Sequence, residues 1–259
     1  MTDTILEVEN VSCTYRESDK ETEALKEVSL KVKEGEFISV IGASGCGKTT
    51  LLRLIAGLNK PGGGRILVGG KEISGHDDQI GYVFQQGSLF DWMTVEQNIA
   101  YGLKAGRVFK ENKSRIPEFI EITGLHGFEK AYPHQISGGM AQRVAIARTL
   151  INNPKILLLD EPMGALDSFT RADLQDKILE LKQLNRTTMI LVTHDVDEAI
   201  YLSDRIVIMT PRPGRISEIM EIDMSHPRNR GSGEFLECRR RLLERFALAH
   251  VESLPEYVI

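Results

Sequence analysis

The clearest chemical motif in the sequence is a glycine-rich run that ends in a lysine and two threonines. It consists of Gly42, Ala43, Ser44, Gly45, Cys46, Gly47, Lys48, Thr49 and Thr50, and its first eight residues match the pattern G-x-x-x-x-G-K-[ST] completely. Such a run lets backbone N–H groups surround a phosphate at a helix start. The lysine can reach the β and γ phosphates, and the threonine hydroxyl can bind Mg²⁺. We therefore expect ATP and Mg²⁺ to bind at this loop.

A second helix start, rich in small residues, lies near the middle of the chain. Ser137, Gly138 and Gly139 precede the helical run 140–148, and no lysine accompanies them. Helix N-termini with exposed N–H groups also attract anions. One ATP site does not need two such helix starts in one molecule. The presence of a second start without a lysine is therefore a clue to both the mechanism and the assembly.

Chemically active side chains follow several short apolar runs that resemble buried parallel strands. The runs cover residues 37–41, 81–84, 156–159, 189–192 and 206–209. The first ends at the glycine-rich loop, and the next three are followed by Gln85, by Asp160 with Glu161, and by Thr193 with His194. Ligands of open α/β sheets bind beyond the carboxyl ends of the strands. We expect Asp160 to suit Mg²⁺ and Glu161 to polarise an attacking water.

The composition is typical of a globular protein with a substantial core. The chain has 259 residues, of which 41% are hydrophobic and 27% charged, and no apolar run is long enough to span a bilayer. The first residues lack the regions of a signal peptide. The net charge of −5 argues against nucleic-acid binding, and three widely spaced cysteines indicate reduced thiols. We expect a cytoplasmic α/β protein.

These motifs together resemble the ATP-binding subunit of an ABC transporter along essentially the whole chain. Residues 136–140 are similar to the family signature L-S-G-G-Q, with Ile136 and Met140 as departures. The resemblance implies a P-loop NTPase (RecA-like) core with a parallel sheet, a small antiparallel β-subdomain and an inserted helical subdomain. The single domain 1–259 would divide into 1–86 (nucleotide-binding core and β-subdomain), 87–150 (helical subdomain), 151–216 (rest of the core) and 217–259 (C-terminal tail).

The resemblance also implies a role for each site residue. Lys48 would bind the phosphates, Glu161 would be the general base and His194 would contact the γ-phosphate. Gln85 would also be catalytic, because it would help to hold the attacking water. Together with Thr49 and Asp160 it would hold Mg²⁺. Residues 165–167 (Ala-Leu-Asp) resemble the D-loop.

Two further expectations concern the adenine and the second subunit. Tyr15 resembles the aromatic residue that stacks on adenine, although it could instead pack within an antiparallel sheet. In a head-to-tail homodimer, Ser137, Gly138 and Gly139 would cap the nucleotide of the partner.

The region 86–95 resembles the surface that receives the coupling helix of a membrane permease. It contains the only tryptophan, Trp92, whose alternative role is packing inside its own subdomain. The segments 211–216 and 226–228 resemble those of nitrate, sulfonate, taurine and bicarbonate importers. A small anionic or organic solute would then reach the permease from a periplasmic or extracellular solute-binding protein. The chain would lie on the inner face of the plasma membrane. Residues 235–246 have the spacing of an amphipathic C-terminal helix.

Other functions of the same ATPase stay open at this stage. The main alternative is an exporter or lipid-transfer complex. An ATPase of DNA repair or chromosome organisation would carry a long coiled coil between Lys48 and Ser137, but this interval has only about 90 residues and no heptads. A translation ATPase usually has two cassettes in one chain. Finally, Cys46 lies near a helix N-terminus, which predicts a lowered thiol pKa and loss of activity on alkylation.

Overall fold

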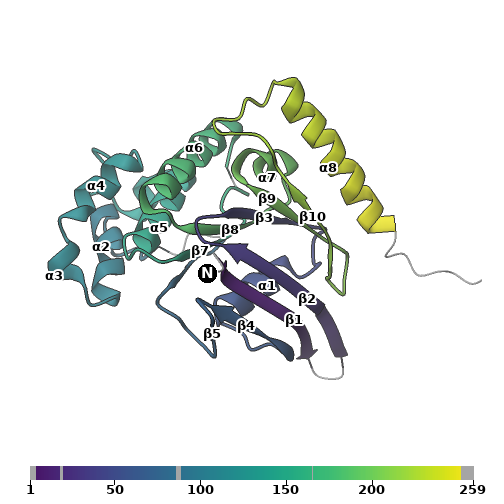
Figure 1. The fold of residues 1–259 in the computed structure, drawn as a ribbon. Coiled ribbons are helices and arrows are strands. Elements are labelled where there is room, and N and C mark those ends of the chain that lie inside the picture. The colour runs from purple at the N-terminus through teal and green to yellow at the C-terminus, as the bar shows by residue number, and fades with distance from the viewer. Residues whose placement is uncertain (1–3, 18–19, 86–88, 165, 252–259) are drawn as a thin grey trace, which may run out of the picture. The chain divides into compact units, whose positions relative to one another are not determined.

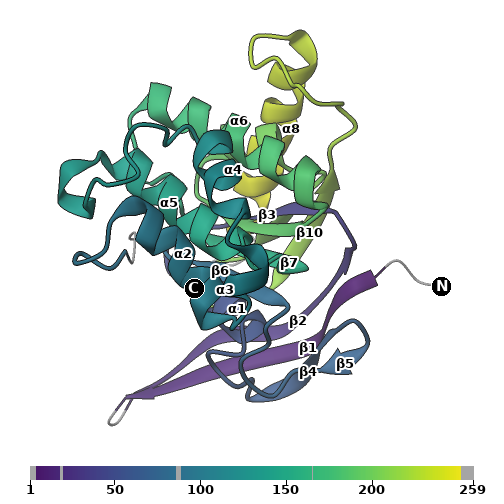
Figure 2. The same ribbon diagram turned by 90° about the vertical axis from the view of Figure 1, so that its left-hand side faces the viewer.

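The computed structural model describes residues 4–17, 20–85, 89–164 and 166–251 (Figures 1 and 2). Three expectations fall on residues outside these ranges: the signal-peptide analysis of residues 1–3, part of the permease surface at 86–88, and Ala165 of the D-loop. The chain divides into two compact units. Unit 1 comprises Met1–Asp77 and Ile190–Ile259, and unit 2 comprises Asp78–Met189.

Unit 1 contains a four-stranded antiparallel sheet with the order β2-β1-β4-β5. Its strands are β1 (Thr4–Glu17), β2 (Lys20–Lys33), β4 (Gly63–Val68) and β5 (Lys71–Glu72). In β2, Val28, Leu30 and Val32 are buried while Ser29 and Lys31 are exposed. This alternation is the pattern of a strand with one face in the core, and it confirms the expected antiparallel sheet.

A second group of strands in unit 1 includes β3 (Phe37–Ile41), in which every residue is buried. It pairs in parallel with β9 (Arg205–Met209), and β9 pairs antiparallel with β10 (Ile216–Glu221). A strand that is apolar at every position, as β3 is apart from Ser39, is typical of a parallel sheet covered on both faces.

The helices among the described residues of unit 1 are α1 (Lys48–Ile55), α7 (Val196–Leu202) and α8 (Gly233–Val251). The expected amphipathic C-terminal helix is α8, which packs against α7, β9 and β10 (Figure 1). Its inner face buries Phe235 and Leu242. On the outer face Arg240 pairs with Glu237 and Glu244, each at 2.6 Å, so these charges form a solvated surface.

In unit 2 the strands β6 (Ile80–Val83) and β7 (Ile156–Asp160) pair in parallel, and the chain segment that connects them is helical. This segment contains α2 (Val95–Ala105), α3 (Phe109–Asn112), α4 (Arg115–Ile122), a 3₁₀ turn (Pro133–Gln135) and α5 (Gly138–Leu150). After β7 comes α6 (Ser168–Asn185), and β8 (Thr188–Val192) spans the point of the chain where the units divide.

Side-chain caps explain where these helices begin. Thr94 accepts from the backbone N–H of Gln97 in a capping box at the start of α2, and Ser137 and Asp167 cap α5 and α6. The strands and helices form a P-loop NTPase-type α/β fold, which confirms the expected fold class.

Some element boundaries differ by one or two residues from the sequence expectation. The run 81–84 corresponds to β6 at Ile80–Val83, so Phe84 lies beyond the strand with its ring 4.5 Å from that of Tyr82. The helix expected from residue 140 begins at Gly138, because Ser137 caps it there. Among the described residues no helix has both the length and the apolar character that crossing a membrane requires.

Candidate active site

The glycine-rich loop joins β3 to α1 in unit 1, as its sequence pattern predicts. Gly45 and Gly47 have φ values of +76° and +102°, a region that residues with a side chain rarely adopt. Gly47 is the N-cap of α1 and supplies no side-chain cap to the first turn. The N-terminal N–H groups of α1 and the positive end of its dipole therefore suit an anion.

Lys48 lies inside this loop and not in solvent. Its side chain is only 6% exposed, and its Nζ donates to the backbone oxygens of Gly42 at 2.9 Å and Ala43 at 3.0 Å. The ammonium group is thus held within the loop by hydrogen bonds to two of its carbonyl oxygens. A positive charge fixed at this position favours binding of a polyphosphate.

The expected lowering of the pKa of the Cys46 thiol is wrong. Burial raises the pKa of its thiol, and the opposing charge of Lys48 offsets this only in part. The side chain is 1% exposed and packs under the loop, where a methyl group on Gly42 would lie 2.5 Å from its Sγ. The thiol therefore does not lie at the exposed helix terminus.

This correction reverses the alkylation experiment. A raised pKa leaves less thiolate at neutral pH, so we expect iodoacetamide at pH 7.5 to modify Cys46 at least about tenfold more slowly than N-acetylcysteine. The rate should rise with pH, and the pH at which it reaches half its maximum should be higher than for the free thiol. Mass spectrometry of the Cys46 peptide measures the rate, and the urea-unfolded chain is the control. Modification of the folded chain at the free-thiol rate would contradict this expectation.

Tyr15 lies in the antiparallel sheet and also contacts the first turn of α1. It lies in β1 of the antiparallel sheet, yet it is 38% exposed. Its hydroxyl donates to Thr50 Oγ1 at 3.3 Å and accepts from Asn59 Nδ2 at 3.0 Å. The ring is therefore anchored beside the first turn of α1, so stacking on adenine stays a prediction.

His194 follows β8 and is exposed at the start of α7. The backbone N–H of its neighbour Thr193 donates to Val40 O at 3.3 Å, two residues before the phosphate loop. Thr193 Oγ1 donates to the buried Glu198 at 2.6 Å, and Asp195 caps α7. These contacts fix the backbone on both sides of His194 within unit 1.

In unit 2 the carboxylate of Asp160 is held at the end of β7. It is 5% exposed, and its Oδ2 accepts a hydrogen bond of 2.8 Å from the hydroxyl of Tyr82 on β6. The sequence analysis missed this partner, because Tyr82 reads as an ordinary strand aromatic. A buried carboxylate with one oxygen fixed in this way is suited to bind a cation.

Glu161 and Gln85 are brought together in the same unit. Gln85 Nε2 donates to Glu161 Oε2 at 3.1 Å. Glu161 has φ +44°, a left-handed conformation that is unusual for a non-glycine residue and that recurs at functional sites. This turn separates Glu161 from the strand that carries Asp160, so the adjacent carboxylates have different surroundings.

The second glycine-rich helix start has two exposed residues and one buried residue. Ser137 and Gly138 are exposed, and Ser137 Oγ accepts from the backbone N–H of Met140 at 3.2 Å. A methyl group on Gly139 would lie 2.2 Å from Thr170 Cγ2, so this glycine lets α5 approach α6 closely. Ser137 and Gly138 are therefore the residues of this motif that a ligand can reach.

Three aromatic residues of unit 2 form a cluster, which we call the aromatic patch: the exposed Trp92 and Tyr101 and the half-buried Phe90. The ring of Phe90 lies 5.3 Å from that of Trp92 and 4.5 Å from that of Tyr101. Trp92 contacts the ring of Phe90 in its own subdomain but is 71% exposed, so most of its surface stays accessible. The fully buried Asn98 holds the adjoining loop through hydrogen bonds to the backbone of Phe90, Met93 and Thr94, a role that its sequence context does not reveal.

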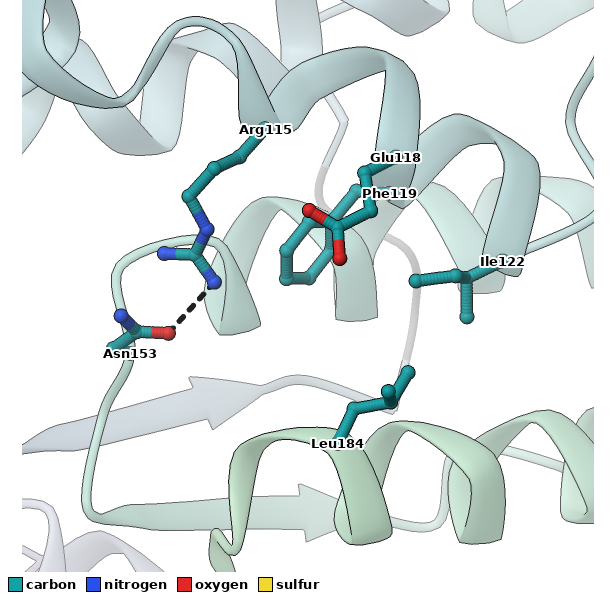
Figure 3. A pocket seen from close by; sticks show the side chains of 6 residues that line it. All are labelled: Arg115, Glu118, Phe119, Ile122, Asn153 and Leu184. Atoms are coloured by element: carbon teal, nitrogen blue, oxygen red, sulfur yellow. Dashed lines mark hydrogen bonds between the residues drawn. The ribbon is translucent and has the colours of Figure 1, made fainter.

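A separate pocket of about 540 Å³ lies in unit 2 (Figure 3). Its lining residues are Arg115, Glu118, Phe119, Ile122, Asn153 and Leu184. Arg115 donates to Asn153 Oδ1 at 2.7 Å and to Ile151 O at 2.9 Å, so protein oxygens already bind its guanidinium. The pocket contains none of the predicted site residues and is not part of the candidate active site.

Comparisons with known proteins agree with this architecture. The family model described as "ABC transporter" matches residues 25–164. The chain is 51% identical to the uncharacterized ABC transporter ATP-binding protein MJ0412 of Methanocaldococcus jannaschii, over 92% of this chain and 90% of the relative. It is 49% identical to the aliphatic sulfonates import ATP-binding protein SsuB of Bacillus licheniformis, over 91% of both chains.

A solved structure shares the same fold. It is the dimeric, post-hydrolysis state of the ATP-binding cassette MJ0796 bound to ADP and Pi, with a TM-score of 0.74 and 33% sequence identity. The match covers 85% of this chain and 100% of the cassette. The family expected from the phosphate loop and the Ser-Gly-Gly motif is thereby confirmed: this chain belongs to the ABC transporter family.

Proposed function

We propose that this chain, an ATPase of the ABC transporter family, powers import of a sulfonate-type solute through a separate membrane permease. The observation that carries the proposal is the 49% identity to SsuB along nearly the entire length of both chains. Relatives named for import favour an importer over the alternative of an exporter or lipid-transfer complex. Nitrate, taurine and bicarbonate are the related solute classes that the experiment must distinguish.

We assign ATP to the phosphate loop of unit 1. Lys48 and the backbone of residues 42–50 would bind the phosphates, and Tyr15 would stack on adenine. His194 would contact the γ-phosphate. The positive helix terminus and the buried ammonium group of Lys48 support this assignment.

Thr49, Gln85 and Asp160 would hold Mg²⁺. The fit rests on their oxygen donors, which a hard cation prefers, and on the burial of Asp160. When bound, Mg²⁺ supplies charge neutralisation at the phosphate oxygens. Glu161 would accept a proton from the attacking water, and Gln85, which contacts Glu161, would orient that water.

Two chains would assemble head to tail, as a homodimer. The exposed Ser137 and Gly138, which have no lysine beside them, support a role as a lid on the ATP of the partner. The solved cassette MJ0796, described as dimeric and bound to ADP and Pi, supports a dimer.

The aromatic patch would receive the permease. Exposed aromatic residues are enriched at protein interfaces, and Trp92 is large enough to act as an anchor. Attachment there would keep the chain on the inner face of the membrane, with the solute-binding protein acting on the permease from the other side.

Transport by a reconstituted complex tests the proposal. We expect proteoliposomes that contain this chain, its genomically adjacent permease and solute-binding protein to take up labelled ethanesulfonate when ATP is supplied. Taurine, nitrate and bicarbonate in separate reactions define the solute class. Efflux of solute, or ATP-dependent uptake of none of these anions, would contradict the proposal.

A Trp92→Ala chain provides the matched variant for the interface. It should lose uptake because the anchor is gone, while ATP hydrolysis by the isolated chain stays within about twofold of wild type. The exposed Phe169→Ala, in the same unit but outside the aromatic patch, should transport like the wild type. Equal uptake by both variants would remove the aromatic patch from the interface.

A further inference from the structure

The turn that connects β9 and β10 packs directly on the phosphate loop within unit 1 (Figure 1). The backbone N–H of Gly214 donates to Ala24 O at 3.0 Å, and Gly214 O accepts from the N–H of Lys26 at 3.0 Å. A methyl group on Gly214 would lie 1.9 Å from Cys46 O. Only glycine therefore fits between β2 and the loop at this point.

Arg212 of the same turn binds the phosphate loop from outside. Its Nε and Nη2 both donate to the backbone oxygen of Gly45, at 3.2 and 3.1 Å. Thr210 stabilises the turn, because its hydroxyl donates to Pro213 O at 3.3 Å and accepts from the N–H of Arg215 at 3.0 Å. The guanidinium thus extends from a fixed base to one carbonyl of the loop.

The orientation of that carbonyl determines where the next N–H points. The peptide between Gly45 and Cys46 is planar and trans, so its C=O and N–H point in opposite directions. With Gly45 O bound to Arg212, the N–H of Cys46 points to the other side, where it donates to Ala43 O at 3.2 Å. Because glycine tolerates several backbone conformations, rotation of the peptide between 45 and 46 is restrained by these two contacts, one to Arg212 and one to Ala43 O.

We infer that Arg212 is a positioning residue of the ATP site. It selects one orientation of the Gly45–Cys46 peptide, and so holds the carbonyl of Gly45 toward the guanidinium and away from the phosphates. A carbonyl that turned inward would instead present a negative dipole to the nucleotide. This inference rests on the proposed binding of ATP at residues 42–50.

Arg215 provides a matched control in the same turn. It is also an exposed arginine, but its Nη1 pairs with Glu27 Oε2 at 3.2 Å and not with the phosphate loop. Arg212→Ala and Arg215→Ala each remove one positive charge from this turn. A difference between the two variants therefore reports the contact with Gly45 and not the net charge.

Equilibrium binding of ATP and ADP to the isolated chain is the test. We expect Arg212→Ala to raise both Kd values about five- to tenfold, because two donors to one loop carbonyl are lost. Arg215→Ala should stay within about twofold. Arg212→Lys, which keeps a donor and the charge, should recover most of the affinity, and all three variants should melt within a few degrees of the wild type.

The outcomes separate failure of this inference from failure of the proposed function. If the wild type binds ATP and Arg212→Ala binds it as well as Arg215→Ala does, Arg212 has no positioning role. If Arg212→Lys does not recover the affinity and Arg212→Ala has a lowered Tm, the role of Arg212 is structural. That result would likewise overturn the inference. If the wild type binds no ATP and Lys48→Ala changes nothing, the proposed function fails and the inference falls with it.

Discussion

Replacing Glu161 by glutamine is expected to lower ATP hydrolysis by about 10²- to 10³-fold while ATP binding is retained. The amide has nearly the shape of the carboxylate and can still accept the hydrogen bond that Gln85 donates at 3.1 Å. It cannot accept a proton from water. Because Glu161 already adopts its left-handed backbone conformation, the substitution adds no new backbone strain. The loss should therefore fall on catalysis and not on stability.

Single-turnover hydrolysis and equilibrium binding of ATP measure the two effects separately. Size-exclusion chromatography with ATP should show an accumulated dimer, since the nucleotide that closes it persists. Glu118→Gln is a suitable control, because it removes a carboxylate of unit 2 that is exposed and lies outside the site. Turnover by Glu161→Gln within a few-fold of wild type would show that another group accepts the proton.

The parts of the site that the sequence predicts are those that depend on local patterns. The apolar runs that end at Gly42, Asp160 and Thr193 identify strand ends, since buried parallel strands need continuous β-branched or aliphatic residues. Likewise Ser137 and the two glycines after it mark a helix start, since Ser137 Oγ accepts from an N–H only three residues ahead. Contacts of this range leave a clear trace in the sequence.

Other features depend on side-chain direction or on distant segments. The helix terminus near Cys46 predicts a lowered pKa, but the thiol packs under the loop and burial raises the pKa instead. The contact of Arg212 with Gly45 joins residues 167 positions apart, so no local pattern could reveal it. The sequence also gives no sign that Asn98 organises the loop beside Trp92.

Mixing two inactive variants is expected to restore activity if each site uses residues of both subunits. Lys48→Ala removes the ammonium group that lies within the phosphate loop, which should abolish ATP binding in that chain. Ser137→Asp keeps a good N-cap for α5 but adds a negative charge that would face the phosphates of the partner. Each variant alone should form dimers with two defective sites.

Ser137→Asn is the matched control for this design. Asparagine is also a good N-cap but is neutral, so it should retain far more activity than Ser137→Asp if charge repulsion is the cause. Equal loss in both variants would point to a steric effect or to weakened α5. Thermal unfolding of the variants checks that the cap is preserved.

Random pairing of the two chains makes the expected recovery quantitative. In an equal mixture about half of the dimers are heterodimers, each with one site in which an intact Lys48 meets an intact Ser137. The other site of the same heterodimer carries both defects. The mixture should therefore hydrolyse ATP at about a quarter of the wild-type rate if the sites act independently. A self-contained site would instead give the mean of the two parent rates, because no pairing could then bring intact Lys48 and Ser137 into one site.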